Sequence, residues 1–204
     1  MRLTDAYGDL CRMDRPVLTT GEAAVRWKAS PRTTRHRLRT MEEAGLLRRL
    51  RPGLWALDPE IRPFAVVPYL AAPHPAYVSL WSALAHHGLI EQVPRRVSVV
   101  SLSRPRKIET TIASYEVHRL APALFGGFAG DDRDGYVAAP EKAIFDTVYI
   151  RAAAGGRAYF TELDLPAGFD RRELRLWIDR IENPRLRTLV ARRTRQVLST
   201  AEGS

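Results

Sequence analysis

Polar residues in the middle of the chain are of types and spacings that do chemistry in proteins. Ser79 and Ser82 are one helical turn apart and His86 follows four residues later, so on a helix these side chains would share a face. Serine beside histidine points to nucleophilic catalysis. Lys142 with Asp146 points to contact with a phosphate or a metal ion.

The same region also has a structural interpretation. Ser79 is a suitable helix N-cap, and His87 beside Gly88 is a suitable helix C-cap donor. Glu141 and Lys142 fit a charge pair in the solvated first turn of a helix. The sequence contains no Walker-type phosphate loop, no His-Arg-Asp kinase motif and no Gly-x-Ser-x-Gly motif. We therefore expect no catalytic residue, cofactor or metal site, and an enzyme that modifies a partner protein, for example by phosphotransfer, stays open as the alternative.

Positive charge is concentrated in the first quarter of the chain. The whole sequence has 32 Lys and Arg against 23 Asp and Glu, a net charge of +9. Arg26 and the segment 28–51 together hold nine basic residues against only Glu42 and Glu43. Such an excess favours an anionic partner, nucleic acid first.

Helix start and stop signals lie in the same segment. Thr19 precedes Glu22 by three residues, the spacing of a capping box that begins a short helix. Ser30 as N-cap and Pro31 at the first helical position begin a second helix, which stops at Gly45. Two short helices joined by a tight turn are the plan of a helix-turn-helix.

The apolar spacing of the second helix predicts which side faces inward. Thr34, Leu38 and Met41 recur at i, i+4 and i+7 and should face the first helix. The opposite side is then cationic, and the first residues of such a helix reach base edges when it enters the major groove.

Arg32, Thr33 and His36 are the residues of this helix that we expect to recognise the DNA sequence. Arg35 and Arg39 fit phosphate or guanine equally well. A basic outer face favours DNA over the alternative use of such a module, which is docking onto another protein.

Residues 46–57 predict two short strands around Pro52-Gly53, which would make the module a winged helix. Basic side chains on this wing would hold flanking phosphates. The complete set of predicted DNA-binding residues is Thr20, Lys28, Arg32, Thr33, Arg35, His36, Arg39, Arg48, Arg49 and Arg51.

Two prolines within the segment Asp58–Pro63 mark a domain boundary. The predicted fold is α+β, with a winged helix-turn-helix over 1–60 and a mixed α/β domain over 61–204. In the second domain we expect helices over Tyr77–Gly88 and Pro140–Ala153 and β-structure over Arg96–Leu102 and Thr111–Leu120.

The last forty residues, about 165–200, predict two further helices. Asp170 and Glu173 have capping-box spacing, and Leu174, Trp177, Ile178 and Ile181 form an apolar stripe that Asn183-Pro184 ends. The following helix carries a basic run from Arg185 to Arg195. That run is interpreted as a solvated helix face, with a second DNA-backbone contact or a surface for an acidic partner as alternatives.

Three phrases in the second domain resemble a known family. They are Tyr77-Val-Ser-Leu-Trp-Ser-Ala-Leu-Ala-His-His-Gly-Leu-Ile-Glu-Gln-Val-Pro94, Val117-His-Arg-Leu120 and Ala139-Pro-Glu-Lys-Ala-Ile-Phe-Asp146. With a winged helix before them, they resemble the AbiEi-type antitoxins of AbiE toxin–antitoxin systems over about residues 15 to 155. Within these phrases, the residues assigned to the motif of the antitoxin domain are Ser79, Ser82, His87, Glu141, Lys142 and Asp146.

The resemblance implies a bacterial antitoxin that represses its own operon and counteracts a toxin of nucleotidyltransferase type through its C-terminal domain. It leaves the route of neutralisation open. Helix-turn-helix proteins usually read half-sites about 34 Å apart, so two copies are expected on an inverted repeat of double-stranded DNA. A winged-helix regulator without a toxin partner is the alternative.

Several other classes of protein are excluded by composition. The single cysteine, Cys11, cannot form an intrachain disulfide, and no Cys/His grouping has zinc-ligand spacing. The first ten residues lack a signal-peptide pattern, and nowhere do eighteen apolar residues run together. The expected location is the cytoplasm, without membrane contact.

Overall fold

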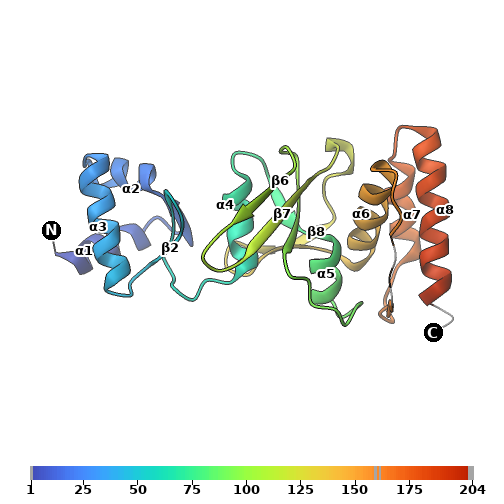
Figure 1. Cartoon of the computed structure of the whole chain (residues 1–204), viewed down its shortest axis with the longest axis horizontal. Coiled ribbons are helices and arrows are strands. Elements are labelled where there is room, and N and C mark those ends of the chain that lie inside the picture. Colours follow the sequence, from blue (N-terminus) through green and yellow to red (C-terminus); the bar gives the residue numbers. More distant parts are fainter. Residues whose placement is uncertain (1, 159, 161, 202–204) are drawn as a thin grey trace.

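The computed structural model describes residues 2–158, 160 and 162–201, and it shows a mixed α and β architecture. Figure 1 shows an elongated molecule with a small N-terminal group of elements at one end, a six-stranded sheet in the middle and a stack of helices at the other. Within the described residues, no helix is both long and apolar enough to cross a membrane.

The N-terminal elements are three helices and a three-stranded antiparallel sheet of order β1-β3-β2. They are α1 (Leu3–Cys11), β1 (Val17–Thr19), α2 (Thr20–Trp27), α3 (Pro31–Glu43), β2 (Arg48–Arg51) and β3 (Leu54–Ala56). The fold-class prediction is confirmed at the level of mixed α and β structure.

Local capping chemistry begins both predicted helices where expected. The Thr19 hydroxyl accepts from the Glu22 backbone N–H at 3.1 Å while the Glu22 carboxylate accepts from the Thr19 N–H at 2.6 Å, so the capping box is formed. Ser30 caps α3, accepting from Thr33 N–H at 3.2 Å, with Pro31 at the first helical position. These bonds satisfy N–H groups that helix starts leave free.

One face of α3 anchors this helix in the N-terminal core. Thr34, Leu38 and Met41 are buried, as the spacing predicts. Leu38 and Met41 belong to a hydrophobic cluster that includes Leu10 and Trp55. The outward face of α3 is thereby fixed toward solvent.

The middle of the molecule is a six-stranded mixed sheet of order β6-β7-β5-β4-β9-β8. Its strands are β4 (Ala76–Val78), β5 (Val97–Ser101), β6 (Arg106–Glu109), β7 (Ser114–Arg119), β8 (Phe128–Asp131) and β9 (Gly135–Ala138). β4 is parallel to β9 and β5 is parallel to β7, whereas the other pairs are antiparallel. The 3-10 helix η1 (Pro63–Val66) and α4 (Val67–Ala71) lead from β3 into β4. Within the six-stranded sheet, α5 (Leu80–His86) connects β4 to β5, and the 3-10 helix η2 (Pro122–Leu124) connects β7 to β8.

The predicted helix Tyr77–Gly88 is wrong at its start. Residues 76–78 form strand β4, and the helix α5 begins at Leu80. β4 lies between β5 and β9, so both of its edges are paired, and all three of its side chains are buried. A buried strand carries a continuous apolar run, which periodicity cannot distinguish from a helix.

The helices at the C-terminal end are α6 (Pro140–Ala153), α7 (Arg171–Asp179) and α8 (Pro184–Ala201). α6 has the predicted bounds, and Figure 1 shows the three side by side. The predicted Asp170–Glu173 capping box is not formed, because the Asp170 carboxylate instead accepts from the Arg172 N–H at 2.7 Å. The apolar stripe is confirmed, since Leu174, Trp177, Ile178 and Ile181 are all buried.

Contacts cross the boundary predicted at Asp58–Pro63. Thr111, between β6 and β7, donates its N–H to the Leu50 carbonyl at 2.9 Å and its hydroxyl to the Arg49 carbonyl at 2.8 Å. Leu50 and other residues of the three-stranded sheet share one hydrophobic cluster with Ile61 and the six-stranded sheet. The two sheets are therefore packed together, and the linker is not the only connection between them.

Candidate nucleic-acid interface and the buried motif

The outer face of α3 is an exposed cationic surface. Arg32, His36 and Arg39 are exposed, and their side chains make no hydrogen bond or ion pair with any described residue. Arg35 is also exposed and donates from Nε to the Pro31 carbonyl at 3.2 Å, within its own helix. Side chains without an internal partner are free to meet an external anion.

Thr33 and Lys28 flank this face at the start of α3. The Thr33 hydroxyl lies 2.9 Å from the Ser30 hydroxyl, so it belongs to the helix cap while remaining exposed. Lys28 is exposed in the turn between α2 and α3, with a left-handed φ of 47°. Its ammonium has no partner among the described residues.

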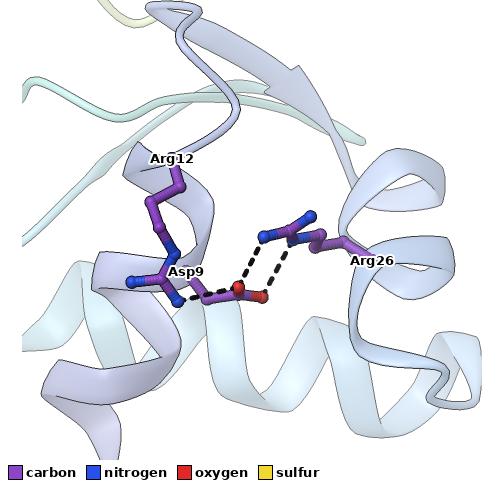
Figure 2. A network of polar contacts seen from close by, with 3 residues as sticks. All are labelled: Asp9, Arg12 and Arg26. Atoms are coloured by element: carbon purple, nitrogen blue, oxygen red, sulfur yellow. Dashed lines mark hydrogen bonds and ion pairs between the residues drawn. The ribbon is translucent and has the colours of Figure 1, made fainter.

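Salt bridges hold α2 against α1 behind this surface. The Asp9 carboxylate accepts from Arg26 at 2.7 and 3.1 Å and from Arg12 at 3.0 Å, which ties α1 to α2 (Figure 2). The hydrogen bonds from Arg26 hold the pKa of Asp9 below its usual value, with Arg12 adding to the effect. Arg37 lies over the Trp27 ring at 5.8 Å and so is directed to α2.

Thr20, predicted to contact DNA, has an internal role in the structure. Its hydroxyl accepts a hydrogen bond from the Trp55 indole at 2.9 Å, and the residue is half-buried. This bond fastens α2 to β3 and satisfies a buried donor. The Thr20 side chain is therefore engaged before any ligand arrives.

The three predicted arginines of the β2–β3 hairpin point to different surroundings. Arg48 donates to the Pro59 carbonyl at 3.3 Å and the Thr111 carbonyl at 3.4 Å, toward the second sheet. Arg49 lies over the Trp55 ring at 5.9 Å. Arg51 is exposed beside the turn and has no side-chain partner among the described residues, so it is the hairpin arginine best placed for an external phosphate.

Three residues of the second predicted set, Ser79, Lys142 and Asp146, meet in a buried cluster. Lys142 and Asp146, one turn apart on α6, are both 0 % exposed and form an ion pair. The other carboxylate oxygen of Asp146 accepts from the Tyr77 hydroxyl at 3.0 Å and the Ser79 hydroxyl at 2.8 Å. The Lys142 ammonium also lies 4.7 Å from the centre of the Trp177 ring.

Burial dominates the electrostatics of this cluster. Loss of hydration raises the pKa of Asp146 and lowers that of Lys142, and the attraction between the two charges opposes both shifts. Burial, with Asp146 nearby, also raises the pKa of Tyr77 far above its usual value. The cluster ties α6 to β4 and α7, which is a structural role.

The structural interpretations of Ser79 and of the Glu141–Lys142 pair are wrong in detail. Ser79 occupies the N-cap position of α5, but its hydroxyl bonds Asp146 rather than the helix. Glu141 and Lys142 are buried rather than solvated, and Glu141 accepts from the Asp170 N–H at 2.7 Å. The Lys142 ammonium is paired with Asp146 and the Glu141 carboxylate is bonded to the Asp170 N–H, so neither side chain is directed to solvent.

The predicted common face of Ser79, Ser82 and His86 does not form a site. The Ser82 hydroxyl accepts from the Ser98 N–H at 2.9 Å and donates to the Arg96 carbonyl at 3.3 Å. His86 packs its ring against Phe64, with 5.7 Å between the centres. The side chains are thus directed to different neighbours.

The last predicted motif residue is His87, and the buried cluster also contains two aromatic residues that were not predicted. His87 ends α5 and its Nε2 lies 2.7 Å from the Ala138 carbonyl. Tyr77 and Trp177 are the members of the buried cluster that sequence reasoning missed. The signal that could have indicated close packing was Gly126-Gly127, since a Cβ at Gly127 would lie 2.7 Å from the Trp177 ring.

The C-terminal basic run is largely solvent-exposed. Arg185, Arg192 and Arg195 are exposed, whereas Arg193 donates to the Gly156 carbonyl and Arg187 donates to the Asp179 carbonyl at 3.5 Å. No group of three or more His, Cys, Asp or Glu side chains that could hold a metal ion occurs among the described residues. No protein-family model matches the chain, and no curated protein matches its sequence.

Proposed function

We propose that the chain is a DNA-binding transcriptional regulator in which β1, α2, α3, β2 and β3 act as a winged helix-turn-helix. The observation that carries this proposal is the outer face of α3, where Arg32, His36 and Arg39 are exposed and have no partner among the described residues. A cationic helix face of this kind fits the negatively charged major groove.

The exposure and contacts of each candidate side chain indicate which part of the DNA it would bind. Arg32, Thr33 and His36, in the first half of α3, read base edges. Arg35 and Arg39 bind phosphate or guanine. Phosphates flanking the groove are held by Arg51 on the wing and by Lys28 in the turn. The remaining candidates, Thr20, Arg48 and Arg49, position these elements through their internal contacts.

We further propose that the chain is an AbiEi-type antitoxin that acts in the cytoplasm. It would bind an inverted repeat at its own operon as two copies and counteract a nucleotidyltransferase-type toxin through the second domain. Support comes from the three sequence phrases of that domain. Because Lys142 and Asp146 are buried, they serve this function by holding the domain together, and toxin contacts must use other residues.

Catalysis at the motif is not supported by its geometry. Both charged groups are fully buried, and the two hydroxyls beside them donate to the carboxylate. A substrate could reach them only if α6 separated from β4. We therefore propose no enzymatic activity.

DNA binding is tested by fluorescence anisotropy with DNA from upstream of the chain's own gene, titrated in salt against a scrambled duplex. The Arg32→Ala/Arg39→Ala variant should lose specific binding. The plot of log affinity against log salt concentration has a negative slope, and the magnitude of this slope should decrease by about 0.9 for each phosphate contact removed.

The matched control is Arg104→Ala/Lys107→Ala, which removes the same charge from exposed residues of the second sheet region. It should keep specific binding. Equal affinity of the wild type for operator and scrambled DNA at about 150 to 200 mM salt would contradict the DNA-binding proposal. If operator binding holds but expression of the neighbouring gene is harmless without this chain, the plain-regulator alternative is correct.

A further inference from the structure

An apolar groove runs along β8, an outermost strand of the six-stranded sheet. The groove has a volume of about 880 Å³, and its walls include Phe64, His86 and Val137. From β9 and the residue after it, the groove touches alternate positions, 135, 137 and 139, as expected for one face of a strand. Along β8 it touches three consecutive residues, 128–130, and also Gly127 before the strand, so there it follows the backbone edge rather than one face.

Backbone groups on this edge of β8 point away from the sheet. The Ala139 N–H donates to the Gly127 carbonyl at 2.9 Å, across the register that pairs Phe128 with Ala138. In an antiparallel ladder this makes Ala129 a hydrogen-bonded position whose N–H and C=O face β9. The corresponding groups of Phe128 and Gly130 then face outward, where no described strand pairs with them.

The groove ends at a group of carboxylates. Asp131, Asp132 and Asp134 follow directly along the chain and are exposed. Asp134 is also part of a second hollow of about 820 Å³, which adds Asp58 and Glu60. Six carboxylates and three arginines line that hollow, an acidic surface on a chain of net charge +9. Asp134 forms an ion pair with Arg62 at 2.7 Å, whereas Asp131 and Asp132 form no ion pair with a described residue. An occupant of the groove therefore meets the negative charge of Asp131 and Asp132 at this end.

We propose that the β8 groove binds an extended segment of a partner protein, which adds a seventh strand to the sheet. The outward groups of Phe128 and Gly130 would bond the segment's backbone, and the apolar wall would take alternate side chains. A Lys or Arg of the segment would meet Asp131 and Asp132. The inference goes beyond the proposed DNA-binding function and uses none of its residues.

The experiment begins with selection of random seven-residue peptides on phage against the full chain. Selected peptides should share alternating apolar residues with Lys or Arg toward one end. On binding the synthetic peptide, hydrogen exchange followed by NMR should show new protection at the Phe128 and Gly130 amides. Protection at Ala129 should change little, because that amide is already bonded in the sheet.

Two comparisons show whether the edge of β8 is what binds. Ala129→Arg places a bulky cation in the groove and should weaken the peptide by at least about tenfold, the loss expected when one or two hydrogen bonds are broken. Ala123→Arg, the same change at an exposed residue of η2 outside the groove, should leave binding unchanged. Peptides N-methylated at alternate amides should bind as weakly as the unmodified peptide binds Ala129→Arg.

Several results would overturn the inference. These are an absence of enriched peptides, equal binding by Ala129→Arg, or full affinity of the N-methylated peptides, which would make the groove a site for a small apolar ligand. A chain that is dimeric in solution and made monomeric by Ala129→Arg would show that a second copy covers the edge. Operator binding measured on the same variants is expected to be unchanged, which keeps this test separate from that of the proposed function.

Discussion

Removing the charge of Asp146 should reveal how much the buried cluster contributes to stability. Asp146→Asn keeps the shape of the side chain and an oxygen that can accept from Tyr77 and Ser79. It leaves the Lys142 ammonium without its counter-charge. This group is 0 % exposed and cannot be rehydrated unless the packing around α6 opens. Breaking a buried pair from one side costs about 3 to 5 kcal/mol, whereas a domain is stable by only about 5 to 15 kcal/mol.

The companion variants are Lys142→Met and the double variant Lys142→Met/Asp146→Asn. Methionine fills the space of the lysine stem among Tyr77, Phe145 and Trp177 without a charge. The double variant should therefore be more stable than Asp146→Asn alone, by about 2 kcal/mol or more. Lys107→Met, at an exposed lysine, is the control and should change stability by less than about 0.5 kcal/mol.

Urea unfolding followed by tryptophan fluorescence measures these differences, since Trp177 lies beside the ammonium. If Asp146→Asn lost less than about 1 kcal/mol, the pair would already be neutral in the folded chain, with the proton on the carboxyl. If the double variant equalled the sum of the two single losses, the charges would not interact. Either result would refute the reasoning.

Two further predictions concern the N-terminal elements. Thr20→Val leaves the buried Trp55 indole N–H without its acceptor and should lower the free energy of unfolding by about 1 to 3 kcal/mol, while Thr4→Val at an exposed residue should not; an unchanged urea midpoint would contradict this. The pKa of Asp9 is held below that of the unfolded chain by Arg26, so its contribution to stability is present above about pH 4 and is lost as the pH falls through the lower folded pKa. The urea midpoint of wild type should consequently fall more steeply than that of Asp9→Asn below about pH 4, and parallel curves would show that the ion pair contributes nothing.

Local signals in the sequence account for the elements that were correctly predicted. The capping box of Thr19 and Glu22 and the Ser30-Pro31 start are satisfied by bonds three residues apart, so they can be recognised without the rest of the fold. The start of α6 follows in the same way from the proline at its first position.

Long-range pairing explains what the sequence could not predict. β4 is a strand because β5 and β9 lie on either side of it, and the register of Val78 with Val137 joins residues 59 positions apart. β6, β8 and β9 are only four residues long and were not predicted. β2 and β3 are as short, but Pro52-Gly53 marks the turn between them, so that hairpin could be predicted. Lys142 was expected in solvent because lysine is almost never fully buried unless paired. Helix α6 alone places it one turn from Asp146, but only the fold brings it beside Trp177.

The hydrogen bonds from Thr111 to Leu50 and Arg49 have a consequence for the proposed binding of DNA. Because the hairpin of the N-terminal module is fastened to the second sheet as well as to the linker, turning α3 in a groove turns the whole molecule. In the proposed complex, the angle at which α3 enters DNA would fix where the six-stranded sheet and the C-terminal helices lie relative to neighbouring base pairs. Two copies on an inverted repeat would face each other in one fixed geometry, so the spacing between half-sites becomes a property of the protein's shape.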